Sequence, residues 1–330
     1  MQAIDIYTHI FPDKFYAELS KSSPKLGNIG QRLRGIPPLF DLDVRFRAMD
    51  KIGADYQQII SLPNPPLEDI ATADVARHLA SVANDAMAEL CDRHKDRFPG
   101  FAAAISMLDI ETAVQEIDRA VLKLGARGVQ IYTNVAGKPL DLPEYEPIFA
   151  AMAKHDLPIW LHPARTSDMT DYASESKSRY EMWWCFGWPY ETSVAMSRLV
   201  FCGLYDRYPK LNIITHHCGG MIPYYDGRVG PGLDVLGGRT ADEDYSKVLP
   251  SLKRPHLEYF HNFYGDTAMF GARTGLLTGV EFFGPEHVVF STDAPLGPIA
   301  ETIKAVESIG LAKDDLAKVM SGNAKRILKL

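Results

Sequence analysis

Residues 128–162 read GVQIYTNVAGKPLDLPEYEPIFAAMAKHDLPIWLH, which is a short apolar run, a longer helical pattern and a second apolar run. The two short runs cover 128–133 and 158–162, and their length and apolar character are typical of buried strands. The pattern between them, at 142–155, is typical of a helix. A strand, a helix and a second strand in this order predict a βαβ unit, whose two strands lie parallel in one sheet.

The same alternation extends along the chain in both directions. Candidate strands cover Ala3–Tyr7, Tyr56–Leu62, Phe101–Met107, Gly128–Thr133, Pro158–His162, Asn212–His216, Phe260–Asp266 and Val288–Ser291. The clearest helical patterns cover Ala71–His94, Ile110–Leu124, Leu142–His155, Glu191–Tyr205 and Ile299–Ile309. Eight strands fit a closed barrel, whereas an open doubly wound sheet usually has fewer strands and a glycine-rich first turn, which is not found after the first strand. We therefore expect residues 1–330 to form a single α/β domain, a (β/α)8 TIM barrel.

Three segments interrupt the alternation: Ser20–Leu42, Arg165–Pro189 and Gly227–Pro255. The first is punctuated by glycine and proline, so we expect it to be irregular. The other two are loop insertions after the fifth and sixth strands, and loops at that end of a barrel form the active-site face. They predict either walls of an active site or surfaces that pack against a neighbouring subunit. The last segment, Lys313–Leu330, predicts a helix pair that closes the opposite end of the barrel.

Composition and charge argue against several classes of protein. Hydrophobic residues make up 46% and charged residues 23% of the chain, the balance of a well-packed globule. The net charge of −7, with no run of lysine or arginine, argues against a nucleic-acid partner. The first residues do not resemble a signal peptide, and no apolar stretch approaches the length of a membrane span. The 4 cysteines have no paired CxxC spacing, which favours free thiols and a cytoplasmic location.

Polar residues gather where the predicted strands end, at Tyr7 and His9, His162, His216 and His217, Asp266, and Asp293. A barrel interior is filled by apolar layers, so imidazoles and carboxylates that converge on one rim need a compensating partner. The simplest common partner is a divalent cation, bound by neutral imidazole nitrogens and a carboxylate oxygen. One strand-end histidine would be weak support, but several strand ends that agree on one rim predict a metal site.

Six stretches carry a resemblance to a known family: IDIYTHIFP (4–12), the segment 125–163 that ends in LHP, LNIITHHCGGMIP (211–223), NFYGDTA (262–268), VVFSTDAPLG (288–297) and GNAKRIL (322–328). Together they resemble the amidohydrolase superfamily. Within it they resemble the branch that holds aminocarboxymuconate-semialdehyde, γ-resorcylate and 5-carboxyvanillate decarboxylases. The resemblance runs from Ile4 to Leu328 with the motifs in family order, and the LHP, HxGG and STD elements are specific only in combination.

The resemblance implies a distorted barrel that holds one divalent metal ion, Zn²⁺ or Mn²⁺. By their match to the family motifs, His9, His162 and Asp293 are expected to be metal ligands. His217 matches the histidine of HxGG and is expected to be the acid/base. His216 matches no family role, and we expect it to be a buried hydrogen-bonding neighbour.

Tyr7 departs from the family pattern, because the first position of the strand-one metal motif is usually His and sometimes Glu. A phenol has a pKa near 10, so it ligates only where the metal lowers that value strongly. Tyr7 could bind as a phenolate, hydrogen-bond to a water on the metal or pack beside the site, and we expect a neighbouring non-ligand. The fourth strand offers Gln130 and no lysine for a carboxylated-lysine bridge, which favours a single metal ion.

The activity that the resemblance implies is non-oxidative decarboxylation, by a carbon–carbon lyase, of a hydroxy-aromatic or muconate-type carboxylic acid. The metal would hold the carboxylate and an adjacent oxygen, and His217 would supply the proton. Arg47, Arg228 and Arg239 are candidates to bind a carboxylate through bidentate hydrogen bonds. Trp188, in the aromatic insertion, is a further candidate for substrate binding.

Two alternatives remain at this point. The first is a metal-dependent hydrolase or hydratase for a lactone, amide or activated alkene, in which Asp293 accepts a proton from the attacking water. The second is a non-catalytic metal-binding partner of a paralogous subunit, which only the presence of Tyr7 favours. The family resemblance also implies a homodimer or a higher homo-oligomer, in which an arginine of an insertion reaches a neighbour's pocket.

Overall fold

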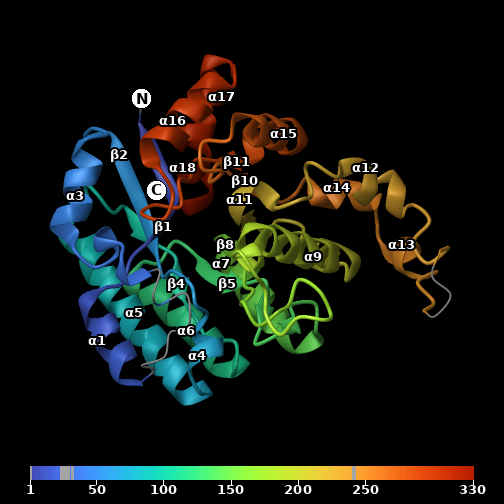
Figure 1. The fold of residues 1–330 in the computed structure, drawn as a ribbon, viewed down its shortest axis with the longest axis horizontal. Coiled ribbons are helices and arrows are strands. Elements are labelled where there is room, and N and C mark those ends of the chain that lie inside the picture. The colour runs from blue at the N-terminus through green and yellow to red at the C-terminus, as the bar shows by residue number, and fades with distance from the viewer. Residues whose placement is uncertain (1, 23–29, 31–32, 240–242) are drawn as a thin grey trace.

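The computed structural model describes residues 2–22, 30, 33–239 and 243–330, and it has the predicted α/β architecture (Figure 1). Nine strand segments form the parallel wall: β1 Ala3–His9, β2 Tyr56–Ser61, β3 Gly100–Phe101, β4 Ala103–Ala104, β5 Val129–Tyr132, β8 Ile159–His162, β9 Ile213–Thr215, β10 Tyr264–Asp266 and β11 Val288–Val289. The hydrogen-bonded orders are β1-β2-β3 and β11-β10-β9-β8-β5-β4. Since β3 and β4 are consecutive pieces of one strand, the wall contains eight strands, as predicted.

The first and last strands complete the ring through backbone contacts. The N–H of Ile6 donates to the oxygen of Phe290 at 2.9 Å, and Thr8 forms a parallel bridge with Ala294. On the other side of β1, a register shift between Asp5 and Thr8 makes its pairing with β2 irregular. The predicted distorted (β/α)8 barrel is confirmed.

Helices cover the outside of the strands. The principal ones are α1 Asp13–Ser22, α3 Leu42–Asp50, α4 Leu67–Ile70, α5 Ala73–Arg93, α6 Ile110–Leu124, α7 Glu146–His155, α9 Gly187–Phe201, α15 Arg273–Phe283 and α16 Ile299–Ser308. A further helix, α14 His256–Phe260, packs against α9. Helix α6 has the predicted bounds because its sequence defines both ends. The side chain of Asp109 accepts a hydrogen bond from the N–H of Thr112, and Gly125 takes the left-handed conformation (φ 74°) that follows many helices.

Two predicted strands differ from the observed ones by three residues or more at one end. The strand predicted at 101–107 ends at Ala104. The strand predicted to start at Phe260 starts at Tyr264, because the preceding residues form α14, whose first turn follows Pro255. Proline favours the start of a helix and disfavours its interior, which explains where this helix begins.

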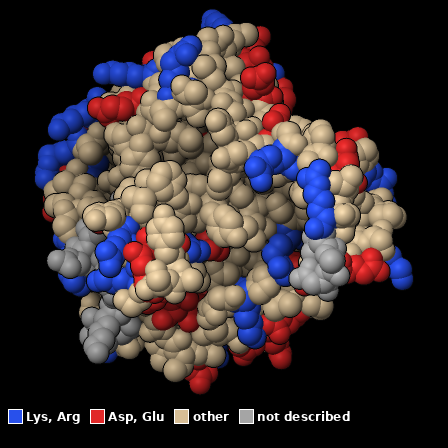
Figure 2. Space-filling view, turned by 45° about the vertical axis from the view of Figure 1, so that its right-hand side comes forward, with Lys and Arg blue, Asp and Glu red and all other residues tan. Residues whose placement is uncertain are grey.

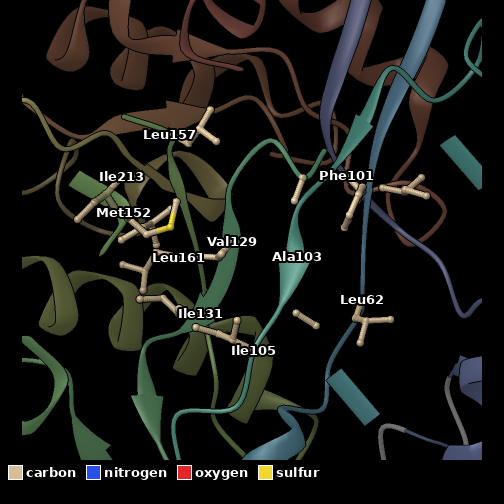
Figure 3. Close-up of a cluster of buried hydrophobic side chains, with 14 of the residues drawn as sticks. Leu62, Phe101, Ala103, Ile105, Val129, Ile131, Met152, Leu157, Leu161 and Ile213 are labelled. Carbon is tan, nitrogen blue, oxygen red and sulfur yellow. The ribbon is translucent and has the colours of Figure 1, made fainter. Parts of the chain in front are cut away.

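Apolar residues pack on both sides of the strands. Figure 3 shows part of the outer layer, in which Val129 and Ile131 of β5 and Leu161 of β8 meet Met152 of α7. Inside the barrel, Trp160 is fully buried and its indole N–H donates across the interior to the oxygen of Ile6 at 2.7 Å. The predicted helix pair closes the bottom: α17 Lys313–Ala317 and α18 Asn323–Leu328 flank a π-helical segment, and α18 packs on this inner layer.

The insertion after β9 forms an arm that projects from the barrel beyond α9 (Figure 1). It carries α12 Asp226–Val229, a 3-10 turn at Pro231–Leu233 and α13 Val248–Ser251. An open groove of about 1030 Å³ runs between this arm and α9, lined by Phe201, Tyr225 and other residues of both. Within the described residues, no helix has the length and apolar character needed to cross a membrane.

Candidate metal centre

Four polar side chains meet where the barrel strands end. His9 is the last residue of β1, His162 is the last of β8, His216 follows β9, and Asp293 lies in the loop after β11. The ring centres of His9 and His162 are 5.4 Å apart, and those of His162 and His216 are 5.1 Å apart. All four side chains are buried. The structure therefore brings together His9, His162 and Asp293, as the sequence predicts, with His216 buried beside them.

The atoms that face the middle of this cluster have no hydrogen-bond partner: His9 Nε2, His216 Nε2 and Asp293 Oδ1. The two nitrogens lie 3.1 and 3.4 Å from that oxygen without forming hydrogen bonds. A buried polar atom left unpaired costs about 1–3 kcal/mol, so three that face one another need a common partner. Ligand atoms of His9, His162 and His216 all lie within 4.8 Å of one another. This donor set fits one divalent cation, since imidazole and carboxylate are ligands of Zn²⁺, and Mn²⁺ also takes carboxylate.

Each histidine is held through its other ring nitrogen. His9 Nδ1 lies 3.1 Å from Leu62 O, His162 Nδ1 lies 2.8 Å from Pro163 O, His216 Nδ1 lies 2.5 Å from Asp266 Oδ2, and His217 Nδ1 lies 2.8 Å from Ala268 O. His162 Nδ1 also lies 3.1 Å from the side-chain amide nitrogen of Asn64, which is a donor. Carbonyl oxygens only accept hydrogen bonds, so in the backbone contacts of His9 and His217 Nδ1 carries the proton. The lone pair is then on Nε2, which is the tautomer that a metal ligand or a proton acceptor needs.

The pKa values of His9, His162 and Asp293 leave each of these groups in the protonation state that binds a cation. Burial lowers the pKa of His9 below its usual 6.5, and burial with the neighbouring imidazoles of His216 and His9 lowers the pKa of His162 well below 6.5. Both are therefore neutral at pH 7. Burial opposes ionisation of Asp293, but the imidazoles of His216 and His9 outweigh it and hold its pKa below the ordinary 3.8. The centre thus presents neutral nitrogens and a carboxylate.

His216 and His217 titrate in opposite directions. Burial alone would lower the pKa of His216, but Asp266 and Asp293 raise it to about 9. A divalent cation at the centre would disfavour protonation of His216. Burial, reinforced by the neighbouring charge of His216, lowers the pKa of His217 to about 4, which makes it a neutral proton acceptor at pH 7.

Tyr7 lies against the centre with its ring stacked on His216 at 4.0 Å between ring centres. It is fully buried and its phenol oxygen has no hydrogen-bond partner. Burial, followed by the nearby Tyr132 and the carboxylates of Asp266 and Asp293, raises the pKa of Tyr7 well above 10. Before a cation binds, Tyr7 is therefore a neutral phenol beside the centre, and its role as a non-ligand stays a prediction.

The centre opens into a cavity with aromatic walls. The lining residues are Leu33, Asn64, His162, Trp184, Trp188, His217, Phe270, Asp293 and Leu296. The ring of Trp188 lies nearly parallel to that of His217, at 9° and 6.4 Å between ring centres, and edge-on to His162 at 5.8 Å. An aromatic substrate that reaches the centre would contact the faces and edges of these rings, which favour flat ligands.

The three candidate arginines lie away from this cavity. Arg47 is an exposed residue of α3, Arg228 is exposed on α12, where it lies 5.8 Å from the ring of Tyr225, and Arg239 is exposed in the arm. Among the described residues that line the cavity there is neither an arginine nor a lysine. The structure of one chain thus brings Trp188 to the cavity, and it does not bring these arginines there.

A buried polar network, which the sequence analysis missed, holds the end of β1. Arg45 is 2% exposed, and its guanidinium donates to His9 O at 2.5 Å, Thr8 Oγ1 at 3.0 Å and Gln58 Oε1 at 2.8 Å. The carboxylate of Asp5 accepts hydrogen bonds from the backbone N–H of Thr292 at 3.0 Å and its hydroxyl at 2.5 Å. The network therefore links the strand of His9 to the residue that precedes Asp293.

The backbone at two site residues is strained. His217 and Asp293 have φ values of 53° and 62°, in the left-handed region that side chains other than glycine rarely adopt. Such residues cost on the order of 1–3 kcal/mol and persist where the surroundings enforce them. Around Asp293 the backbone N–H groups of Leu296 and Gly297 both donate to its carbonyl oxygen at 2.8 Å. This turn fixes the direction of the carboxylate.

The barrel and its polar rim define a class of metal-dependent barrel proteins, and comparison with known proteins gives the family. The family model described as amidohydrolase matches residues 4–330, so this chain belongs to the amidohydrolase family, as its motifs predict. The γ-resorcylate decarboxylase of Polaromonas sp. is 32% identical over 302 residues, which span 87% of each protein. The 2-amino-3-carboxymuconate-6-semialdehyde decarboxylase of Dictyostelium discoideum is 28% identical over 99% of this chain and 91% of its own.

Solved structures of similar proteins have the same fold over the whole chain. A dihydroxybenzoic acid decarboxylase from Polaromonas sp., solved with bound manganese and the inhibitor 2-nitroresorcinol, is 27% identical with a TM-score of 0.81, and the match covers 100% of this chain and 97% of that one. The 5-carboxyvanillate decarboxylase from Sphingomonas paucimobilis is 26% identical with a TM-score of 0.82, over 100% and 99% of the two chains.

Proposed function

We propose that this protein is a metal-dependent, non-oxidative decarboxylase of a hydroxy-aromatic carboxylic acid. The observation that carries the proposal is the set of unpartnered, buried Nε2 and Oδ1 atoms of His9, His216 and Asp293, the last of which lines a cavity with aromatic walls. Relatives that span most of the chain are decarboxylases of such acids, and one structure with the same fold holds manganese. His9, His162 and Asp293 are the proposed ligands of one ion, Zn²⁺ or Mn²⁺.

A divalent ion held there would act as a Lewis acid and would stabilise the negative charge that develops on the substrate. The protein's own side chains supply the rest. Trp184, Trp188 and Phe270 pack against the substrate ring and keep water from it. Because neither an arginine nor a lysine is among the described residues that line the cavity, the arginines proposed from the sequence have no assigned contact within one subunit.

His217 is the proposed proton carrier. Its Nδ1 donates to Ala268 O, so the neutral Nε2 is free to accept the proton of the substrate hydroxyl. The imidazolium then gives that proton to the ring carbon that bears the carboxylate. The C–C bond breaks, CO₂ leaves, its bonding electrons return to the ring, and solvent restores the hydroxyl proton. This sequence needs a histidine that is neutral before substrate binds, which its lowered pKa of about 4 provides.

The proposal is tested by incubating the purified, metal-loaded chain with hydroxybenzoic acids and with muconate semialdehydes, while CO₂ and organic products are measured. The proposal predicts equal amounts of CO₂ and of the decarboxylated product. Ring opening or hydrolysis with the carboxylate retained would instead establish a hydrolase or hydratase. Activity that requires a paralogous partner would establish the non-catalytic alternative.

We also propose that the chain assembles as a homodimer or a higher homo-oligomer through the face that carries the arm. Support comes from the open groove beside α9 and from the exposed side chains of Tyr190, Tyr224 and Val235 near it. Figure 2 shows that uncharged residues cover much of the face that includes this region. Sedimentation at micromolar concentration tests the assembly, and a monomer would refute it. The 4 cysteines, all free thiols, support our proposal of a cytoplasmic location.

A further inference from the structure

The two ring nitrogens of His216 have different surroundings. Nδ1 lies 2.5 Å from Asp266 Oδ2, and Asp266 is itself held by the backbone N–H groups of Cys218 at 3.2 Å and Ala268 at 3.1 Å. Nε2 has no partner and faces Asp293 Oδ1 at 3.4 Å. A carboxylate on one nitrogen and a free, buried second nitrogen is the arrangement of an imidazole that binds a metal.

We propose that His216 is a fourth protein ligand of the metal ion, beside His9, His162 and Asp293. The inference rests on the metal centre of the proposed function and goes beyond it, because the family motifs assign His216 no such role. Ligand atoms of the three histidines lie within 4.8 Å of one another, and those of His216 and Asp293 do too. One ion with bonds of about 2.0–2.2 Å can therefore reach all four after small movements.

The position of Tyr7 explains why a histidine from another strand serves here. The strand-one motif has a phenol where it usually has a ligand, and the Tyr7 ring lies flat against His216 at 4.0 Å. The stack fixes the plane of the imidazole, while Asp266 fixes its rotation. His216, which follows β9, therefore points its Nε2 into the centre with its ring against that of Tyr7.

The two adjacent histidines, His216 and His217, then have separate roles. The rings of His216 and His217 are stacked 3.8 Å apart, but each has its own anchor, Asp266 for the first and Ala268 O for the second. His217 lines the cavity, whereas His216 is fully buried behind it. His216 therefore holds the ion, and His217 remains free to carry a proton.

The test measures metal affinity rather than turnover. His216→Ala and His216→Gln are titrated with Zn²⁺ and with Mn²⁺ against a competing chelator, and circular dichroism checks that each is folded. Outer-shell partners of metal ligands typically contribute about 10–100-fold in affinity, so loss of a direct ligand should cost at least about 100-fold. Asp266→Asn should fall within the outer-shell range. Tyr7→Phe keeps the stacked ring and is the matched control, with an expected change of less than about threefold.

A second measurement needs no variant. Anomalous diffraction from crystals of the wild-type protein loaded with Zn²⁺ should place the ion about 2.0–2.2 Å from His216 Nε2. Unchanged affinity in a folded His216 variant, or an ion bound by the other three residues beyond bonding distance of His216, would overturn the inference. A bond to the Tyr7 oxygen in its place would overturn it as well. Failure of the wild-type protein to bind any divalent ion would instead refute the metal centre of the proposed function.

Discussion

Replacing Arg45 by methionine removes the guanidinium that holds the end of β1. Methionine fills a similar length of the buried space but donates no hydrogen bond. Three buried acceptors then lose their donor: His9 O, Thr8 Oγ1 and Gln58 Oε1. The positive charge near the buried carboxylate of Asp5 is lost too, although burial already raises the pKa of that carboxyl to about 7.

The size of the effect follows from these contacts. Each buried acceptor left unpaired costs about 1–3 kcal/mol, and removing one member of a buried charged network costs about 3–5 kcal/mol in total once local relaxation is included. Burying the guanidinium charge of Arg45 also has a cost, and removing that charge offsets part of the cost of the unpaired acceptors. We therefore expect the free energy of unfolding of Arg45→Met to be lower by about 3–5 kcal/mol. Because His9 O loses its donor, we also expect metal affinity to fall by about 10-fold or more, the effect of a lost outer-shell contact.

Urea unfolding of the metal-free protein and chelator competition measure the two effects. Arg47→Met is the matched control, because Arg47 lies two residues along α3 and is exposed. Its unfolding free energy should stay within about 0.5 kcal/mol of the wild-type value, with unchanged metal affinity. If Arg45→Met unfolds within about 1 kcal/mol of the wild-type protein, the network does not hold β1 and the reasoning is refuted.

Four further predictions follow from the site. His162→Ala should lose bound metal, as elemental analysis would show, and retained stoichiometric metal would remove His162 from the ligand set. His217→Gln should keep metal but lose about 10²–10⁴-fold in kcat, and normal turnover would refute its role as proton carrier. Trp188→Leu should raise KM for an aromatic acid more than it lowers kcat, and an unchanged KM would argue that the ring does not contact substrate. The pKa of His217 is lowered from 6.5 to about 4 by folding, so as pH falls the unfolded chain takes up this proton at a higher pH than the folded protein does. Metal-free stability should therefore fall as pH drops through that range, and His217→Gln should flatten this dependence; identical pH profiles would contradict it.

The sequence predicts the barrel and the gathering of polar residues at its rim for one physical reason. His9, His162 and Asp293 each end or follow an apolar strand, and parallel strands of a barrel bring their carboxyl ends to one rim. No comparable rule locates the arm after β9, because its segment has neither a strand nor a long helical period. The sequence therefore leaves open whether this segment is a wall of the active site or a subunit contact.

Two features of the site were not predicted from the sequence, and local geometry explains each. On α3, Arg45 and Met49 are four residues apart and share the buried face, whereas Arg47 lies on the exposed face. The i, i+4 spacing could have favoured Arg45 over Arg47 as the functional arginine. For the His216–His217 pair, strand alternation would place the two rings on opposite sides, but the left-handed backbone at His217 turns both toward the centre.

The central claim is that one divalent ion at the strand-end cluster drives loss of CO₂. The most direct test is a titration of chelator-treated protein with Zn²⁺ or Mn²⁺ while CO₂ release from a carboxyl-labelled dihydroxybenzoate is followed. We predict no release without metal, and a rate that rises linearly and levels off at one ion per chain. Full activity after complete removal of metal, or no CO₂ from any hydroxy-aromatic acid at saturating metal, would contradict the account.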